Sequence, residues 1–403
     1  MNLLKEGIET KAVIPTKHFK KLTIDGHTED YPVYKIRLDM LYYNDQNDRI
    51  ATWITQYKLD NGISTFDMSN QKKYNDIIHD FITDSNVDSL RKTQKNMRMF
   101  GQQVPGVVLF DGRIIDGNRR FTCLRNIQID DVETGYFEAA ILDRKINDNK
   151  KQIKMLELKL QHGEDVKVGY NPIDRLVGIY HDIIDTKLLT IKEYAKSVDQ
   201  SEKDIELEVE KAKLMGEFLE FINAPKQFHI ARIFNLSDPL KELYAMLKKI
   251  SDNDKKEDLK NNVFAQLFIY SGDTTRYMRK IKKIVGSAKY LDEYLENLSE
   301  TVYKVCEELS NHNNITNKEI NEIRSNDEIK SEFTHATERY LTKTDNDTTR
   351  NQPAKQVEKA YDSLDVIDNN ILKKLTSEQK EEILERIEMI EELTTKLRSG
   401  LDV

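Results

Sequence analysis

The sequence has few cysteines and no long apolar run, and each shortage excludes a class of protein. Its two cysteines, Cys123 and Cys306, lie far apart in the 403 residues, which gives no support to a disulfide framework or to a zinc site with paired ligands. No stretch approaches the roughly 18 uninterrupted apolar residues of a membrane span, and Lys5 and Glu6 interrupt the amino terminus before an apolar run forms. We therefore expect a soluble, cytoplasmic protein with no membrane partner.

An excess of positive charge is also absent. The chain has 62 Lys and Arg residues against 70 Asp and Glu residues, for a net charge of -8, so any surface that binds nucleic acid must be a local basic patch. Hydrophobic residues make up 38% and charged residues 33% of the chain, a balance that favours long, solvated helices. At roughly 100–200 residues per domain, the length predicts two to four domains.

Strand signals are confined to the first part of the chain. Short apolar runs occupy 33–43, 106–110 and 113–115, and Asp111-Gly112 between the last two runs predicts a hairpin. Residues 69–100 carry apolar side chains at helical spacing instead. We therefore predict an α+β protein, in which an N-terminal arm (1–30) precedes a small mixed-sheet domain (31–150).

From about residue 151 the helical period dominates, which predicts a predominantly α-helical remainder. Its expected parts are a helical domain with a helix-turn-helix-like segment (151–230), a second helical domain (231–341), a linker rich in Thr, Asp and Asn (342–355) and a C-terminal helical hairpin (356–403). Thr376 and Gln379 match a capping box in that hairpin. Its apolar stripes fit ordinary packing or a dimer interface.

The stretch 101–125 is the most informative. A strand is predicted to end at Ile115, to turn through Asp116-Gly117 and to lead into a helix that begins with Asn118, Arg119 and Arg120. The first turn of a helix has N–H groups without intrahelical partners and a positive dipole end, so this turn suits an anion such as phosphate.

Two interpretations of this turn stay open from the residues alone. In one, the arginines bind a phosphate, with Arg119 the more available because Arg120 lies four residues before Leu124, close to the apolar face. In the other, Asn118 caps the helix and the arginines pair with carboxylates.

The same stretch resembles the central motifs of the ParB-type partition proteins and their wider ParB/sulfiredoxin-like superfamily. The resemblance includes Gly101–Pro105, Gly117–Arg120, the loop within 36–50 that ends near Arg49, the segment 158–174 and the helix-turn-helix-like segment 190–209. The motifs follow in the family's order over about 36–222, roughly half of the chain.

The resemblance implies a nucleotide switch in which CTP or another nucleoside triphosphate, bound with magnesium, closes a dimeric clamp on DNA. By position it places Gln103 near the base, Gly117, Asn118, Arg119 and Arg120 near the triphosphate, and Gln161 in the third motif. It implies a homodimer or another protein partner as well.

This chain departs from the family at the positions that hold the metal. Asn118 stands where the family usually has a carboxylate, and Leu158 and Lys159 stand where its third motif has Glu-Asn. Magnesium is usually bound by one or two carboxylates together with phosphates, so the departures favour binding over hydrolysis unless Glu157 shifts into place. Cys123 lies inside the helix and not at the turn, which predicts a buried structural cysteine.

The sequence predicts a DNA-binding surface outside the helix-turn-helix-like segment. The second helix of the helix-turn-helix-like segment carries more acids than lysines, which disfavours contact with a phosphate backbone. A basic helix over 272–286 is the better candidate, with the DNA-binding residues Arg276, Arg279, Lys280, Lys282 and Lys283. The alternative for that helix is a solvated charged face.

The preferred hypothesis is therefore a ParB-like, nucleotide-binding, DNA-associated regulatory switch of a bacterium, plasmid or phage. Two rivals remain: a superfamily enzyme such as a nucleotide hydrolase, nuclease or kinase, and a protein-interaction scaffold with a vestigial pocket. No catalytic residue is assigned, and whether the chain is a weak NTPase is left open.

Overall fold

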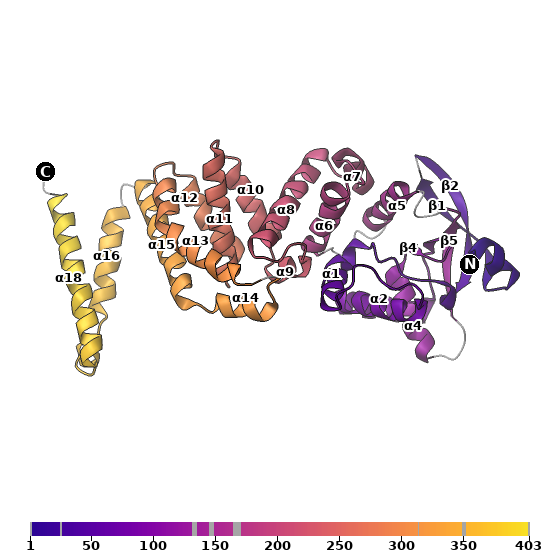
Figure 1. The fold of residues 1–403 in the computed structure, drawn as a ribbon, viewed down its shortest axis with the longest axis horizontal. Coiled ribbons are helices and arrows are strands. Elements are labelled where there is room, and N and C mark those ends of the chain that lie inside the picture. Colours follow the sequence, from indigo (N-terminus) through magenta and orange to yellow (C-terminus); the bar gives the residue numbers. More distant parts are fainter. Residues whose placement is uncertain are drawn as a thin grey trace. The chain divides into compact units, whose positions relative to one another are not determined.

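The computed structural model describes residues 2–24, 26–130, 135–144, 149–163, 171–312, 314–348 and 352–401. Within these residues, a five-stranded sheet with its flanking helices forms the N-terminal part, and every element after the sheet is helical (Figure 1). The predicted α+β class is confirmed. In the described part of the chain, no helix is both long enough and apolar enough to cross a membrane.

The sheet has the strand order β1-β2-β5-β3-β4. Its strands are β1 (Val13–Ile24), β2 (His27–Arg37), β3 (Gly106–Leu109), β4 (Ile114–Asp116) and β5 (Tyr136–Leu142). Only β3 and β5 run parallel, and the other neighbours are antiparallel. The predicted hairpin at Asp111-Gly112 joins β3 to β4, where Gly112 has a φ of 96° and its N–H donates to the Leu109 carbonyl at 3.0 Å.

The predicted N-terminal arm (1–30) is wrong in its boundary, because residues from Val13 onward form the edge of the sheet. Strand β1 pairs with β2 from Val13 through Ile24. Its side chains are mostly exposed, and Val13, Leu22 and Ile24 are the apolar ones that are buried. An edge strand covered mainly on one face keeps many charged residues, so the lysines of β1 conceal the strand signal.

Apolar residues on both faces of the sheet form the core, as the alternation of side chains along a strand requires. On β5, Phe137, Ala139 and Ile141 join one cluster, whereas Ala140 and Leu142 join the other. The first cluster includes residues of α1 (Ala51–Asp60), α2 (Gln71–Ser85) and α4 (Asn118–Asp130). The second is covered by Ile153, Leu156 and Leu160 of α5 (Lys150–Gly163). Helix α3 (Val87–Phe100) packs against α4 through Leu90, Met97 and Cys123.

The helical part that follows begins at Pro172. Its elements are α6 (Pro172–Ile179), the π-helical turn η4 (Tyr180–Asp185), α7 (Ile191–Val198), α8 (Glu202–Phe221), α9 (Phe228–Ile233), α10 (Ser237–Leu247), α11 (Asn253–Ile269), α12 (Thr274–Val285), α13 (Leu291–Ser310), α14 (Asn317–Arg324) and α15 (Asp327–Thr348). Helices α7 and α8 occupy the range predicted to be helix-turn-helix-like, with Asp199 in the left-handed conformation between them. The prediction that the acidic second helix does not contact a DNA backbone stays a prediction.

The chain divides into two compact units, 1–338 and 339–403. The second unit holds the end of α15, α16 (Gln352–Asp365), α17 (Asn369–Leu372) and α18 (Ser377–Ser399). The predicted capping box is present, since Thr376 and Gln379 exchange hydrogen bonds at the start of α18. The predicted linker (342–355) is partly wrong because α15 continues to Thr348. The Thr, Asp and Asn residues of this segment have low helix propensity. Propensity is a weak preference, however, and a helix that has already formed can extend through such residues. Residues 349–351 lie outside the described residues.

A buried cluster of charges joins the sheet domain to the helical part. Lys154 on α5 places its Nζ 2.8 Å from Asp48, in the short turn η3 (Asp48–Ile50), and 3.4 Å from Asp182 in η4. Glu157, one turn along α5, is 3.9 Å from the same Nζ. All four side chains are more than nine-tenths buried.

The cluster contains more acids than bases, so one carboxyl group retains its proton. Burial raises the pKa of Glu157 to about 8, against the opposing attraction of Lys154. Burial alone would lower the pKa of Lys154, but the attraction of Asp48, Glu157 and Asp182 outweighs it and raises that pKa. Burial also raises the pKa of Asp48, so Glu157 and Asp48 together couple the cluster to pH.

Glu157→Gln is expected to flatten the dependence of stability on pH. Because the folded state binds the Glu157 proton more tightly than the unfolded chain does, the stabilisation is complete below pH ~4.5 and is lost as the pH rises toward about 8. Each pKa unit corresponds to about 1.4 kcal/mol, so between pH 5 and 8 the natural protein should lose at least ~1 kcal/mol more than the variant. Urea unfolding at both pH values measures this, and equal losses would contradict it.

Candidate functional site

A cavity of about 440 Å³ lies beside the turn from β4 to α4. It is bordered by the turn η3, by α2 and α3, by the loop before β3, by the start of α4 and by α5. The residues that line it are Asn47, Arg49, Ile50, Ile82, Ser85, Thr93, Val104, Ile115, Asp116, Gly117, Asn118, Arg119, Arg120 and Gln161. The cavity thus contains the whole predicted turn, Gly117–Arg120, and the predicted Gln161.

The turn has the conformation that the sequence predicts. Strand β4 ends at Asp116, Gly117 has a φ of 107°, and α4 begins at Asn118. The Gly117 carbonyl accepts the first helical hydrogen bond, from Phe121 N at 2.9 Å. A Cβ on Gly117 would lie 2.7 Å from the Phe137 ring, so this position requires glycine on both steric and conformational grounds. The N-terminal end of α4 therefore borders the cavity.

Arg120 is an anchor as well as a lining residue. Its Nη2 donates to Asp116 Oδ2 at 2.7 Å, and its Nη1 donates to the Val104 carbonyl at 2.7 Å. Lys20 from β1 reaches the same carboxylate at 3.8 Å and donates to the Pro105 carbonyl at 3.0 Å. The interpretation in which an arginine pairs with a carboxylate thus holds for Arg120, which fixes the loop before β3 onto α4.

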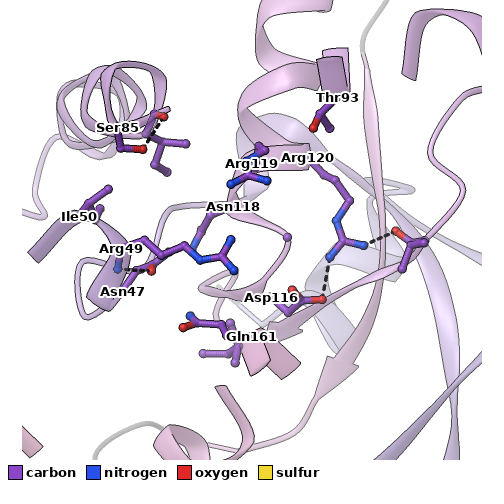
Figure 2. Close-up of a pocket in the computed structure, with 14 residues that line it drawn as sticks. Asn47, Arg49, Ile50, Ser85, Thr93, Asp116, Asn118, Arg119, Arg120 and Gln161 are labelled. Atoms are coloured by element: carbon purple, nitrogen blue, oxygen red, sulfur yellow. Dashed lines mark hydrogen bonds and ion pairs between the residues drawn. The ribbon is translucent and has the colours of Figure 1, made fainter. Parts of the chain in front are cut away.

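Arg49 and Arg119 approach the cavity from different sides (Figure 2). Arg49 belongs to η3, whose start is capped by Asn47 through a 3.0 Å hydrogen bond to Arg49 N. Gln161 comes from α5, and its amide donates to Glu157 at 2.9 Å. Among the described residues that line the cavity, three are arginines and one, Asp116, is acidic, so the cavity favours an anion.

Asn118 has an unsatisfied hydrogen-bond acceptor at the cavity. Its side chain is 7% exposed, and its Oδ1 is buried without a hydrogen-bond partner. Because Gly117 supplies the first helical acceptor, the predicted capping role of Asn118 is wrong. A buried polar atom without a partner costs about 1–3 kcal/mol.

Gln103 is not among the residues that line the cavity, and its place near a base stays a prediction. Its side chain is exposed and donates to the Phe100 carbonyl. The neighbouring Gln102 instead binds the backbone of Glu138 on β5 through both ends of its amide, at 2.7 and 2.9 Å. That pairing directs Gln102 toward the sheet and leaves Gln103 outside. Residues 164–170, in the predicted third motif, lie outside the described residues.

Several lining residues were missed as site candidates. Ser85 and Thr93 are single hydroxyl residues on helices, which carry no signal in the sequence. Asn47 and Arg49 had a signal, because the loop that contains them resembles a family motif, but spacing did not place them opposite Arg119. Their position depends on η3, which the buried Lys154 cluster fixes.

The predicted DNA-binding residues lie on α12, with their positive charge partly compensated. Asp273 caps the helix, and Met278, Ile281, Ile284 and Val285 are buried as the amphipathic pattern requires. However, Lys280 pairs with Glu338, and both Lys282 and Arg279 pair with Glu242, at 2.6 and 3.6 Å. Arg276 and Lys283 complete the predicted set on the same helix. The acids weaken the attraction that a phosphate backbone would experience, which favours the alternative of a solvated charged face.

Comparison with known proteins gives similarity to solved structures alone. No family model matches the chain, and no curated protein matches it. A solved structure, the C-terminally truncated chromosome-partitioning protein ParB from Caulobacter crescentus complexed with CTP-gamma-S, matches with 11% identity over 62% of this chain and 98% of that chain, at a TM-score of 0.19. This degree of similarity leaves the family of the chain unassigned.

Cys123 is structural, as predicted. It is 0% exposed on α4, and its Sγ lies 3.7 Å from the Leu90 carbonyl. Burial raises the pKa of its thiol to about 12, although Arg119 opposes the shift. A thiol in this state is a poor nucleophile at neutral pH, so we do not expect Cys123 to react with a ligand in the cavity.

Cys123 is expected to resist thiol reagents in the folded protein. In Cys306→Ser, which leaves Cys123 as the single thiol, labelling by Ellman's reagent at neutral pH should proceed only as fast as the protein unfolds. In Cys123→Ser, the half-buried Cys306 should react faster. Rapid labelling of Cys306→Ser without denaturant would contradict the burial of Cys123.

Proposed function

We propose that the cavity binds the phosphate groups of CTP or another nucleoside triphosphate, and that the chain is a ParB-like nucleotide-binding switch. One observation carries the proposal. The N-terminal end of α4 and three arginines meet at one cavity. A volume of about 440 Å³ also lies within the range of roughly 300–1,000 Å³ that small-molecule sites occupy.

The rival interpretation as an enzyme receives less support. Phosphoryl transfer requires a group that positions or deprotonates the attacking nucleophile. Asp116 already accepts from Arg120, and Glu157 is buried behind Gln161 with a pKa of about 8. These two carboxyl groups are thus engaged or protonated at neutral pH, which favours binding over hydrolysis.

The rival interpretation as a scaffold predicts a closed cavity with neutralised arginines. Arg120 meets that description, because Asp116 holds it. A cavity of about 440 Å³ is present, however, and Arg49 and Arg119 are among the residues that line it. The site therefore retains the features that a phosphate requires.

A connection between the cavity and the helical part supports the role of a switch. In the turn η3, Asn47 and Arg49 line the cavity, whereas Asp48 between them binds the buried Lys154. The backbone of Gly178 on α6 packs on the Asp48 carboxylate so closely that a Cβ would lie 2.6 Å from it. A ligand that moves Arg49 would therefore act on α6 and η4 through Asp48.

Arg119→Ala and Arg49→Ala are each expected to weaken nucleotide binding. A charge-assisted hydrogen bond to phosphate contributes about 1.5–3 kcal/mol, so the affinity for CTP should fall by about tenfold or more. Arg398→Ala on α18, where the arginine is exposed, is the matched control and should leave the affinity unchanged. Isothermal titration with CTP, ATP and GTP measures this, and unchanged affinity in both cavity variants would refute the proposal.

We also propose that the C-terminal hairpin mediates self-association. It exposes apolar side chains along α16 to α18, and those that are at least 45% exposed include Leu364, Ile371, Leu384 and Leu393. A large exposed apolar surface on a polar protein marks an interaction site. A second copy is the partner that supplies an equal apolar stripe on a helical hairpin.

Ile387→Glu on α18 is expected to shift the chain toward a monomer. The substitution places a charge in the apolar stripe, so burial against a second copy would cost several kcal/mol unless the charge is paired. Glu392→Ala, on the opposite face of α18, is the control and should leave the mass unchanged. Light scattering during gel filtration distinguishes the two states. A natural protein that is monomeric at all concentrations would refute the proposal.

A further inference from the structure

We infer that the cavity binds its polyphosphate ligand without a divalent metal ion, because guanidinium groups supply the neutralising charge. This inference rests on the proposed function and concerns the charge chemistry of the same site. The resemblance to the ParB family implies magnesium, so the question is whether the residues present fit such an ion. Their arrangement does not fit it.

Asp116 is the sole carboxylate among the described residues that line the cavity. Its Oδ2 accepts from Arg120 at 2.7 Å and lies 3.8 Å from the Lys20 ammonium. A divalent cation at this carboxylate would approach two positive groups. Magnesium is usually held by one or two carboxylates together with phosphates, and here the carboxylate is already neutralised.

The other positions suited to a metal ligand supply no charge. Asn118 offers a neutral amide at the start of α4. Glu157 is 2% exposed, lies behind Gln161 and has a pKa of about 8, so it is mostly protonated at neutral pH. In the described part of the chain, no three His, Cys, Asp or Glu side chains gather in a group able to hold a metal ion.

The positive groups at the cavity are instead arginines. Arg49 and Arg119 line it beside Arg120, whose charge is already paired with Asp116. A guanidinium is planar and its N–H groups match the geometry of phosphate oxygens. Asn118 fits this arrangement better than a carboxylate does. Its amide is neutral and adds no negative charge beside a phosphate. A carboxylate at this position would repel the phosphate unless a cation lay between them.

The test compares binding with and without free divalent ions. Inorganic triphosphate and CTP are titrated into the natural protein in buffer with excess magnesium and in buffer with excess EDTA. The affinity in EDTA is expected to be at least as high as that in magnesium. A decrease of up to about threefold, which corresponds to ~0.7 kcal/mol, counts as equal. A loss of tenfold or more in EDTA would overturn the inference while leaving the proposed function intact.

Asn118→Asp provides the matched gain of function. The new carboxylate is expected to lower the affinity in EDTA by about tenfold or more and to make binding depend on magnesium. Asn118→Ala removes the amide without adding charge and should show no response to magnesium. Thermal unfolding of each variant without ligand checks that the fold is intact. If Asn118→Asp and Asn118→Ala respond to magnesium alike, the inference fails.

The two failures can be told apart. If neither probe binds the natural protein in either buffer, and Arg119→Ala behaves in the same way, the proposed function fails and the inference fails with it. If binding is present and depends on Arg119 but is lost in EDTA, only the metal-free inference fails. Electron paramagnetic resonance with Mn²⁺ gives an independent readout, since no immobilised Mn²⁺ is expected in the complex of the natural protein.

Discussion

The buried ammonium of Lys154 is the interaction on which the arrangement of the site depends. It contacts Asp48 in η3 and Asp182 in η4 from its place on α5, so three segments far apart in the sequence share one charge. Removing a single member of a buried ion pair leaves an uncompensated charge and typically costs about 3–5 kcal/mol. The contact therefore fixes η3 against α5 and the helical part more firmly than apolar packing at a three-residue turn would.

This constraint determines which groups face the cavity. Asp48 is drawn into the protein, so its neighbours Asn47 and Arg49 lie at the wall of the cavity. On α5, Gln161 follows Glu157 by one helical turn and reaches the same cavity. On both η3 and α5, neighbouring residues thus belong to two different clusters. The cluster inside the protein is rich in acids, and the cluster at the cavity is rich in arginines.

The parts of the site that depend on local backbone chemistry could be predicted from the sequence. The bend at Gly117, the start of α4 and the hairpin at Gly112 follow from glycine placement and apolar spacing, and all three are present. The parts that depend on distant partners could not be predicted. Gln102 pairs with β5, Glu242 pairs with two cations of α12, and η3 carries Arg49 to the cavity. Each of these results from a tertiary contact that periodicity does not encode.

Neutral groups lie between the acids around Lys154 and the cavity, and they keep negative charge away from an incoming phosphate. If Glu157 were ionised, its negative charge would oppose an incoming phosphate across Gln161, since the interaction between charges is strong where water is scarce. Its raised pKa avoids this, because a protonated Glu157 adds no charge between the acids around Lys154 and the arginines at the cavity. Asn118 on α4 likewise adds no negative charge at the cavity, because its side chain is a neutral amide and not a carboxylate. The cavity thus attracts an anion because the residues nearest to it, apart from the paired Asp116, are cationic or neutral.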